Sequence, residues 1–139
     1  MKLNNRKKVL AINSFLIAAL FGLVSFNKEV LRPKFVNTPL INTLTGCFPN
    51  FAAAYIISLA VVIAVFIRKP KSGRLIVIIS SIIVFVILMT EELIPMWGAS
   101  TYYDLYDILA SGLGSLLAIL TFEIFIKIQN IKTGKKGLG

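Results

Sequence analysis

Four acidic residues, Glu91, Glu92, Asp104 and Asp107, lie close together in the sequence at the junction of two long apolar segments. Acids at the edge of a hydrocarbon layer are costly and usually serve a function. Two carboxylates in a medium of low dielectric constant do not both hold a charge easily, so one can keep a proton and act as an acid while another acts as a base. Glu91, Glu92 and Asp107 are therefore the candidate catalytic residues.

Two other interpretations of these acids stay open. If the segment after Asp104 is a helix, Asp107 lies near its positive end and can cap it, while the other three acids are solvated residues at the membrane surface. Passage of a cation or proton is the second alternative. It receives less support, because no acid lies in the middle of an apolar segment.

The chain has no histidine and a single cysteine, Cys47. Zinc and haem sites are usually built from these residue types, and the common hydrolase triads need an imidazole base. A single thiol also cannot form an internal disulfide. We therefore predict no metal and no cofactor, and a packing role for Cys47.

The elements that position the acids are long and apolar. Hydrophobic residues make up 57% of the 139 residues and the mean hydropathy is +0.84, whereas soluble domains contain about 45–50% apolar residues. Four runs come close to the roughly 20 residues that a helix needs to cross a bilayer: Val9–Phe26, Asn50–Ile67, Leu75–Ile94 and Leu105–Ile128. The sequence predicts an all-α integral membrane four-helix bundle, in which residues 1–139 form a single transmembrane domain and the lipid bilayer is the main partner.

Basic residues form three clusters, before the first run, between the second and third runs, and after the fourth. Their members are Lys2, Arg6, Lys7 and Lys8, then Arg68, Lys69, Lys71 and Arg74, then Lys127, Lys132, Lys135 and Lys136. Because connections rich in Lys and Arg stay in the cytoplasm, both termini are predicted to be cytoplasmic and the acidic residues to lie outside. This topology and attraction to anionic lipids account for the net charge of +9, so no nucleic-acid partner is expected.

The first run and the connection after it allow more than one interpretation. A basic start followed by an apolar run is also how a signal peptide begins, but residues 23–27 are a poor cleavage site, so we expect the first helix to be retained. Residues 27–48 are expected to lie on the outer membrane surface. Pro49 then suits the first turn of the second helix, and Asn50 can cap that helix or pack between helices.

The last apolar run carries small side chains at Ser111, Gly114, Ser115 and Ala118. Residues three and four apart share one helix face, and small residues there let a neighbouring backbone approach closely. Asp107 lies four residues before Ser111 and therefore on the same face. We predict that this face points into the bundle and packs against another helix.

The order of acids and small residues resembles the VanZ-like family of small bacterial membrane proteins, over roughly the C-terminal half of the chain. The family pattern has a glutamate near the end of the third helix, a Gln and an Arg in the hairpin, and then Asp, Asn and Gly on the fourth helix. Glu91 or Glu92 matches the glutamate, Asp107 the Asp and Gly114 the Gly.

Three positions depart from that pattern. Ile94 stands in place of the Gln, Ser111 stands in place of the Asn, and no Arg occurs between Glu92 and Asp107. The chain is thus a divergent match that lacks an ion pair the family can form. The resemblance implies a protein of the bacterial envelope, in a family whose founding member is linked to glycopeptide-antibiotic tolerance.

We therefore expect a VanZ-like, multi-pass protein of the bacterial cytoplasmic membrane that acts at the outer leaflet in a cell-wall or lipid-linked process. A lipid-linked envelope substrate is its candidate partner, and whether it catalyses a reaction is left open. One alternative is a small transporter or channel subunit, which would need to form a homo-oligomer because four short helices enclose little space. Another is a non-catalytic membrane assembly or scaffold protein. A transporter predicts a polar path through the bundle, and a scaffold predicts an exposed face of small residues.

Overall fold

The computed structural model describes the backbone of residues 2–94 and 104–134, and the side chains of Lys7, residues 10–94 and residues 104–128. All secondary structure in these ranges is helical, and four helices are long and apolar enough to cross a membrane. The predicted fold class is confirmed. In chain order the elements are α1 (Lys2–Phe26), the π-helical η1 (Asn27–Leu31), α2 (Arg32–Lys34), α3 (Pro39–Arg68), α4 (Gly73–Leu93) and α5 (Leu105–Gly134).

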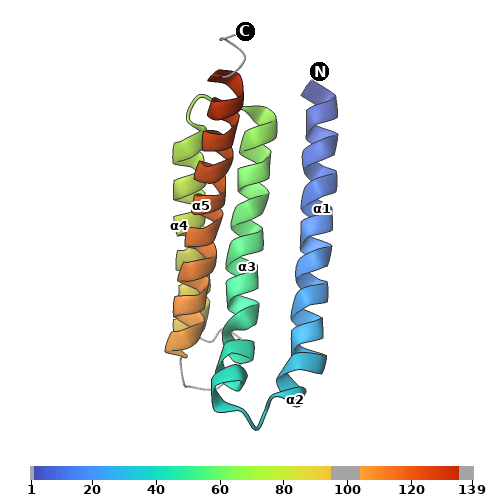
Figure 1. Ribbon diagram of the computed structural model, residues 1–139, viewed down its shortest axis with the longest axis vertical. Helices are drawn as coiled ribbons and strands as arrows, with labels where there is room; N and C mark the ends of the chain where they lie inside the picture. Colours follow the sequence, from blue (N-terminus) through green and yellow to red (C-terminus); the bar gives the residue numbers. More distant parts are fainter. Residues whose placement is uncertain (1, 95–103, 135–139) are drawn as a thin grey trace.

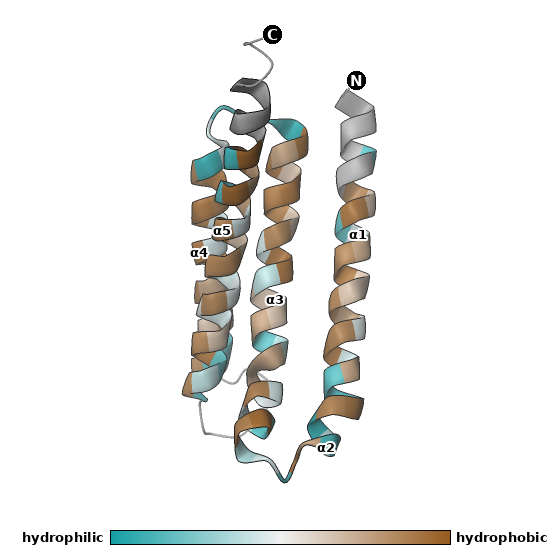
Figure 2. Cartoon of the chain, in the orientation of Figure 1, coloured by the Kyte–Doolittle hydropathy of each residue, from teal (hydrophilic) through white to brown (hydrophobic). Residues whose placement is uncertain are grey.

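The long helices run up and down beside one another (Figure 1). One end, which we call the basic end, holds the start of α1, the 69–72 turn and the end of α5. The other, the acidic end, holds residues 35–38, the end of α4 and the start of α5. Apolar residues cover the middle of each helix, and hydrophilic residues gather toward both ends (Figure 2). This is the pattern of a bundle that crosses a bilayer.

The helix α3 is the common partner of the bundle, because it packs against α1, α4 and α5. By contrast, α1 packs against α3 and has no close backbone approach to α4 or α5. Only 6% of the α1 span is buried, compared with 33% for the spans of α3 and α5. The bundle is therefore a three-helix unit, α3–α4–α5, with α1 attached to one of its sides.

The start of α3 differs from the prediction. The helix begins at Pro39, so Pro49 lies inside it and does not occupy a first turn, and Asn50 does not cap its start. Residues 39–48, expected on the membrane surface, form the first turns of this helix. A proline inside a helix removes the N–H that would bond the carbonyl four residues earlier, which here is the carbonyl of Thr45.

A side chain from α1's continuation replaces that missing hydrogen bond. The Nδ2 of Asn27, the first residue of η1, donates to the Thr45 carbonyl oxygen at 2.7 Å. Asn27 is only 1% exposed. The prolonged α3 is thus compatible with Pro49, because the carbonyl that the proline leaves without a partner has a donor. This contact also fastens α1 to α3 at the acidic end.

A close contact between α5 and α3 is made at Gly114. A Cβ atom placed there would collide with the carbonyl oxygen of Phe51, and would lie 2.9 Å from both the Ala54 Cβ and the Tyr55 nitrogen. Because glycine has no Cβ, the backbones of α5 and α3 can touch at this level. The rest of the small-residue face is buried with it, at Ala110, Ser111, Ser115 and Ala118.

Candidate functional site at the acidic end

The first turn of α5 is capped by two acids. The backbone N–H of Tyr106 donates to Asp104 Oδ1 at 2.9 Å, and the N–H of Asp104 donates to Glu92 Oε1 at 3.0 Å. These carboxylates satisfy amides that the start of a helix leaves without partners. The capping role considered for Asp107 therefore belongs to Asp104, assisted by Glu92 from the end of α4.

Asp107 follows Asp104 along the chain and lies in the first turn of α5. Its Oδ1 is buried and has no hydrogen-bond partner among the described residues. The carboxyl group lies close enough to Glu92 and Asp104 to be repelled by them, and close to the amide of Asn50 on α3. Arg32 is the one basic group that acts on it by charge attraction in the described part of the chain. Asp107 is thus half-buried between α3 and α5, and one of its carboxylate oxygens has no donor in the described part of the chain.

The structure brings together two of the three candidate catalytic residues. Glu92 and Asp107 belong to one cluster, whereas Glu91 is exposed and takes no part in it. Asn50, which was expected either to cap its helix or to pack between helices, lies beside Asp107, in agreement with the second alternative. Arg32 was not predicted as a neighbour of Asp107, and the local sequence does not identify it, because its place depends on the helical continuation of the chain beyond Phe26.

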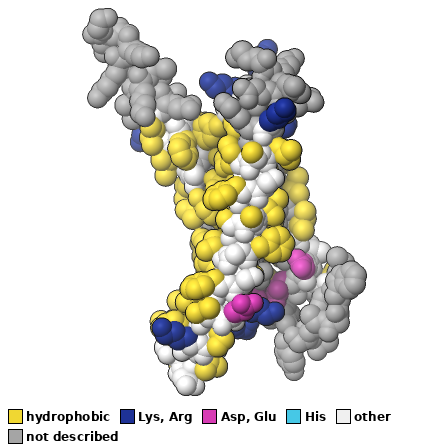
Figure 3. All heavy atoms as spheres, turned by 90° about the vertical axis from the view of Figure 1, so that its right-hand side faces the viewer, with side chains coloured by type: hydrophobic (Ala, Val, Ile, Leu, Met, Phe, Trp, Pro, Cys, Tyr) yellow, Lys and Arg dark blue, Asp and Glu magenta, His cyan; other side chains and the backbone are white. Residues whose placement is uncertain are grey.

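Carboxylates and basic groups occur together at this end of the molecule. On the face drawn in Figure 3, acidic side chains gather toward the acidic end, with Lys and Arg nearby, whereas the basic end of that face shows Lys and Arg. Tyr106 is exposed at the start of α5, as expected for a residue of an interfacial aromatic belt. The sequence predicts that Trp97, Tyr102 and Tyr103 belong to the same belt, but they lie outside the described residues.

Polar side chains continue from Asp107 into the bundle. Ser111 and Ser115 follow at intervals of four residues on α5, and both are buried. The hydroxyls of Ser115, Ser58 on α3 and Ser81 on α4 are buried without a partner in the described structure. A polar column therefore extends from the acidic end toward the middle of the three-helix unit.

An apolar cluster closes this column toward the basic end. Val62 and Val65 of α3, Val77 of α4 and Phe122 of α5 pack together there, and the exposed fraction of each is 8% or less. In the described residues these buried polar side chains stop at the apolar cluster and form no continuous polar path through the bundle. The small-residue face of α5 is buried against α3 and is not exposed.

The polar side chains at the acidic end are suited to hydrogen bonding. In the described part of the chain no three His, Cys, Asp or Glu side chains are arranged so that they could hold a metal ion. Asp107 can accept hydrogen bonds, and Asn50 can both donate and accept them. Such a pair suits hydroxyl or ammonium groups at the edge of the membrane.

Fold and site together define the class: an all-α, multi-pass membrane protein with a cluster of acidic side chains at one end of a three-helix unit. No family model, curated protein or solved structure matches the chain.

Proposed function

We propose that this is a VanZ-like protein of the bacterial cytoplasmic membrane that binds a lipid-linked envelope substrate at the outer leaflet. The observation that carries the proposal is the buried Oδ1 of Asp107, which lies beside Asn50 and the capping acids and has no donor among the described residues. A buried acceptor without a donor costs about 1–3 kcal/mol. A substrate that supplies a donor at this point is therefore stabilised when it binds.

The distribution of buried side chains supports binding at one membrane face over passage through the membrane. The buried polar side chains end at Val62, Val77 and Phe122, so a group bound at Asp107 would stay at the acidic end. The positive-inside rule puts that end outside the cell. Sugar hydroxyls of a lipid-linked saccharide would reach Asp107 and Asn50 from the head-group region while the lipid tail stays in the bilayer.

The test compares cells that carry the wild type with cells that carry Asp107→Asn or Glu92→Gln, under challenge with cell-wall-directed antibiotics. Membrane abundance is matched by immunoblot, because a site variant must still accumulate. We expect both changes to remove a wild-type effect on tolerance, since each replaces a carboxylate of the cluster by an amide of the same size.

Glu91→Gln is the matched control. It removes the same charge from the neighbouring residue of α4, but Glu91 is exposed and lies outside the cluster. The proposal predicts wild-type behaviour for this variant. If all three variants behave as wild type, or if Glu91→Gln is as damaging as Glu92→Gln, the acids act only through the general charge of the surface and the proposal is wrong.

A further inference from the structure

A groove lies in the half of the molecule nearer the basic end, between α1 and the three-helix unit. It has a volume of about 350 Å³ and is lined by Asn13 of α1, by Ala60, Val61, Ala64, Val65 and Arg68 of α3, and by Pro70 and Ile76. This volume lies within the range of about 300–1,000 Å³ typical of small-molecule sites. The α3 wall runs from Ala60 to Arg68, which is about 12 Å of helix at 1.5 Å per residue.

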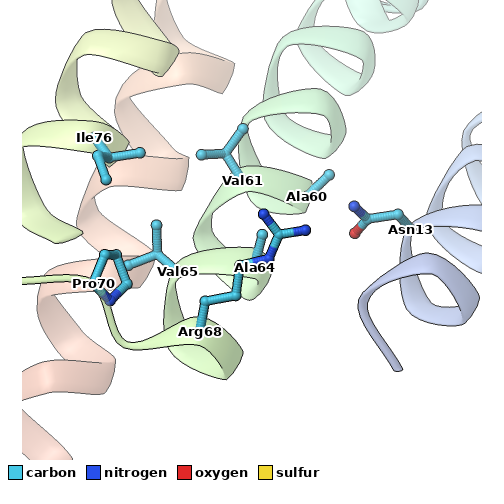
Figure 4. A pocket seen from close by; sticks show the side chains of 8 residues that line it. All are labelled: Asn13, Ala60, Val61, Ala64, Val65, Arg68, Pro70 and Ile76. Carbon is cyan, nitrogen blue, oxygen red and sulfur yellow. The ribbon is translucent and has the colours of Figure 1, made fainter. Parts of the chain in front are cut away.

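Two polar groups face the same space from opposite walls. Figure 4 shows the guanidinium of Arg68 and the amide of Asn13 pointing toward each other across the groove, above a floor of apolar side chains. Arg68 has no carboxylate within ion-pair distance among the described residues, whereas the nearby Arg74 is paired with Glu123. Asn13 Oδ1 is buried, and no donor for it occurs in the part of the chain that the structure describes. The groove therefore offers a positive charge and an unmet acceptor beside an apolar channel.

The position of the groove relative to the membrane indicates which kind of ligand it binds. It begins at the basic end and reaches about 12 Å into the bundle, which is close to one leaflet of a hydrocarbon layer about 30 Å thick. A soluble anion would satisfy Arg68 and leave the apolar walls empty. A phospholipid fills both parts, with its phosphate at Arg68 and an acyl chain along Ala60, Ala64 and Ile76.

We propose that this groove binds an anionic glycerophospholipid with a hydroxyl-bearing head group, taken from the leaflet at the basic end. Arg68 donates charge-assisted hydrogen bonds to the phosphate. A head-group hydroxyl donates to Asn13 Oδ1. The bound lipid lies between α1 and the three-helix unit and contacts both. This site lies at the other end of the molecule from Asp107 and does not depend on the function proposed for it.

Electron spin resonance of spin-labelled lipids in phosphatidylcholine bilayers tests the proposal on the reconstituted full chain. We expect labelled phosphatidylglycerol to associate about fivefold more strongly than labelled phosphatidylcholine, the ratio that one basic residue near a membrane surface supplies. Arg68→Gln should remove this preference. Arg74→Gln, which removes the same charge at the same end from an arginine already paired, should retain it.

Two further variants separate a built site from general surface charge. Ala64→Phe fills the groove without changing charge and should abolish the preference. Asn13→Leu should erase any advantage of phosphatidylglycerol over phosphatidylmethanol, an anionic lipid without a head-group hydroxyl, while both stay ahead of phosphatidylcholine. Circular dichroism confirms that each variant is folded. The proposal is overturned if the wild type shows no preference, or if Arg68→Gln and Arg74→Gln lower it equally.

Discussion

Replacing Asn27 by leucine should destabilise the protein because it removes the donor for a carbonyl that Pro49 leaves without a partner. The side chain is almost fully buried and its bond to the Thr45 oxygen is 2.7 Å long. A neutral hydrogen bond contributes about 0.5–1.5 kcal/mol, and a buried acceptor that loses its donor costs about 1–3 kcal/mol. Couplings measured between membrane helices are at most about 1.7 kcal/mol. We therefore expect the free energy of unfolding to fall by about 1–2 kcal/mol.

The second half of this prediction is a rescue. Alanine at position 49 restores an N–H that can bond the Thr45 carbonyl within α3. In a Pro49→Ala background, Asn27→Leu should then cost about 1 kcal/mol less than in the wild-type background. The assay is unfolding of the four proteins of this double-mutant cycle in mixed micelles with increasing sodium dodecyl sulfate, followed by far-ultraviolet circular dichroism.

Additivity is the result that refutes this reasoning. If Asn27→Leu lowers stability equally in both backgrounds, within the roughly 0.5 kcal/mol expected of independent sites, the Asn27 amide does not compensate for the proline. The prolonged α3 would then need another explanation.

Three further predictions concern single positions. Gly114→Ala should destabilise the chain by about 1–3 kcal/mol by overpacking in the same micelle assay, whereas Gly22→Ala, whose added Cβ meets nothing within 4 Å, should not. Lys69→Gly should stabilise the end of α3 by about 1 kcal/mol, because Lys69 has a φ of 48°, a backbone conformation that glycine adopts without strain. An unchanged midpoint of unfolding in the micelle assay would show that this strain is absent. A membrane-impermeant maleimide should label Cys47, the sole thiol, in intact cells, and labelling only after permeabilisation would reverse the predicted topology.

Much of the fold follows from composition and charge. The apolar runs predict four membrane helices, and the ends of α4 and the start of α5 fall within two residues of the predicted bounds. The start of α3 and the helical continuation of the chain after α1 do not follow, because they depend on a contact between distant residues. Local rules end a membrane helix near Phe26 and start the next near Pro49, whereas the bond from Asn27 to Thr45 makes a longer α3 compatible with the proline.

The candidate site could be predicted only in part, because it too depends on contacts that local sequence does not determine. Sequence spacing brings Glu92 near the start of α5, since a short hairpin joins the two helices. It does not decide which acid caps that helix, because Asp104 and Asp107 are both near its positive end. The hydrogen bond from the Tyr106 N–H assigns the cap to Asp104. Asp107 is then left without this partner, a distinction that depends on backbone geometry.

The central place of α3 has a consequence for biosynthesis. As the chain emerges from the ribosome, α1 enters the bilayer before α3, and Asn27 has no acceptor until Thr45 follows 18 residues later. The narrow face of α3 around Ala54 is in turn not covered until α5 arrives with Gly114. The three-helix unit is therefore completed only after α5 has been made, and a chain that stops before α5 presents an unfinished α3 to the proteases that clear misassembled membrane proteins.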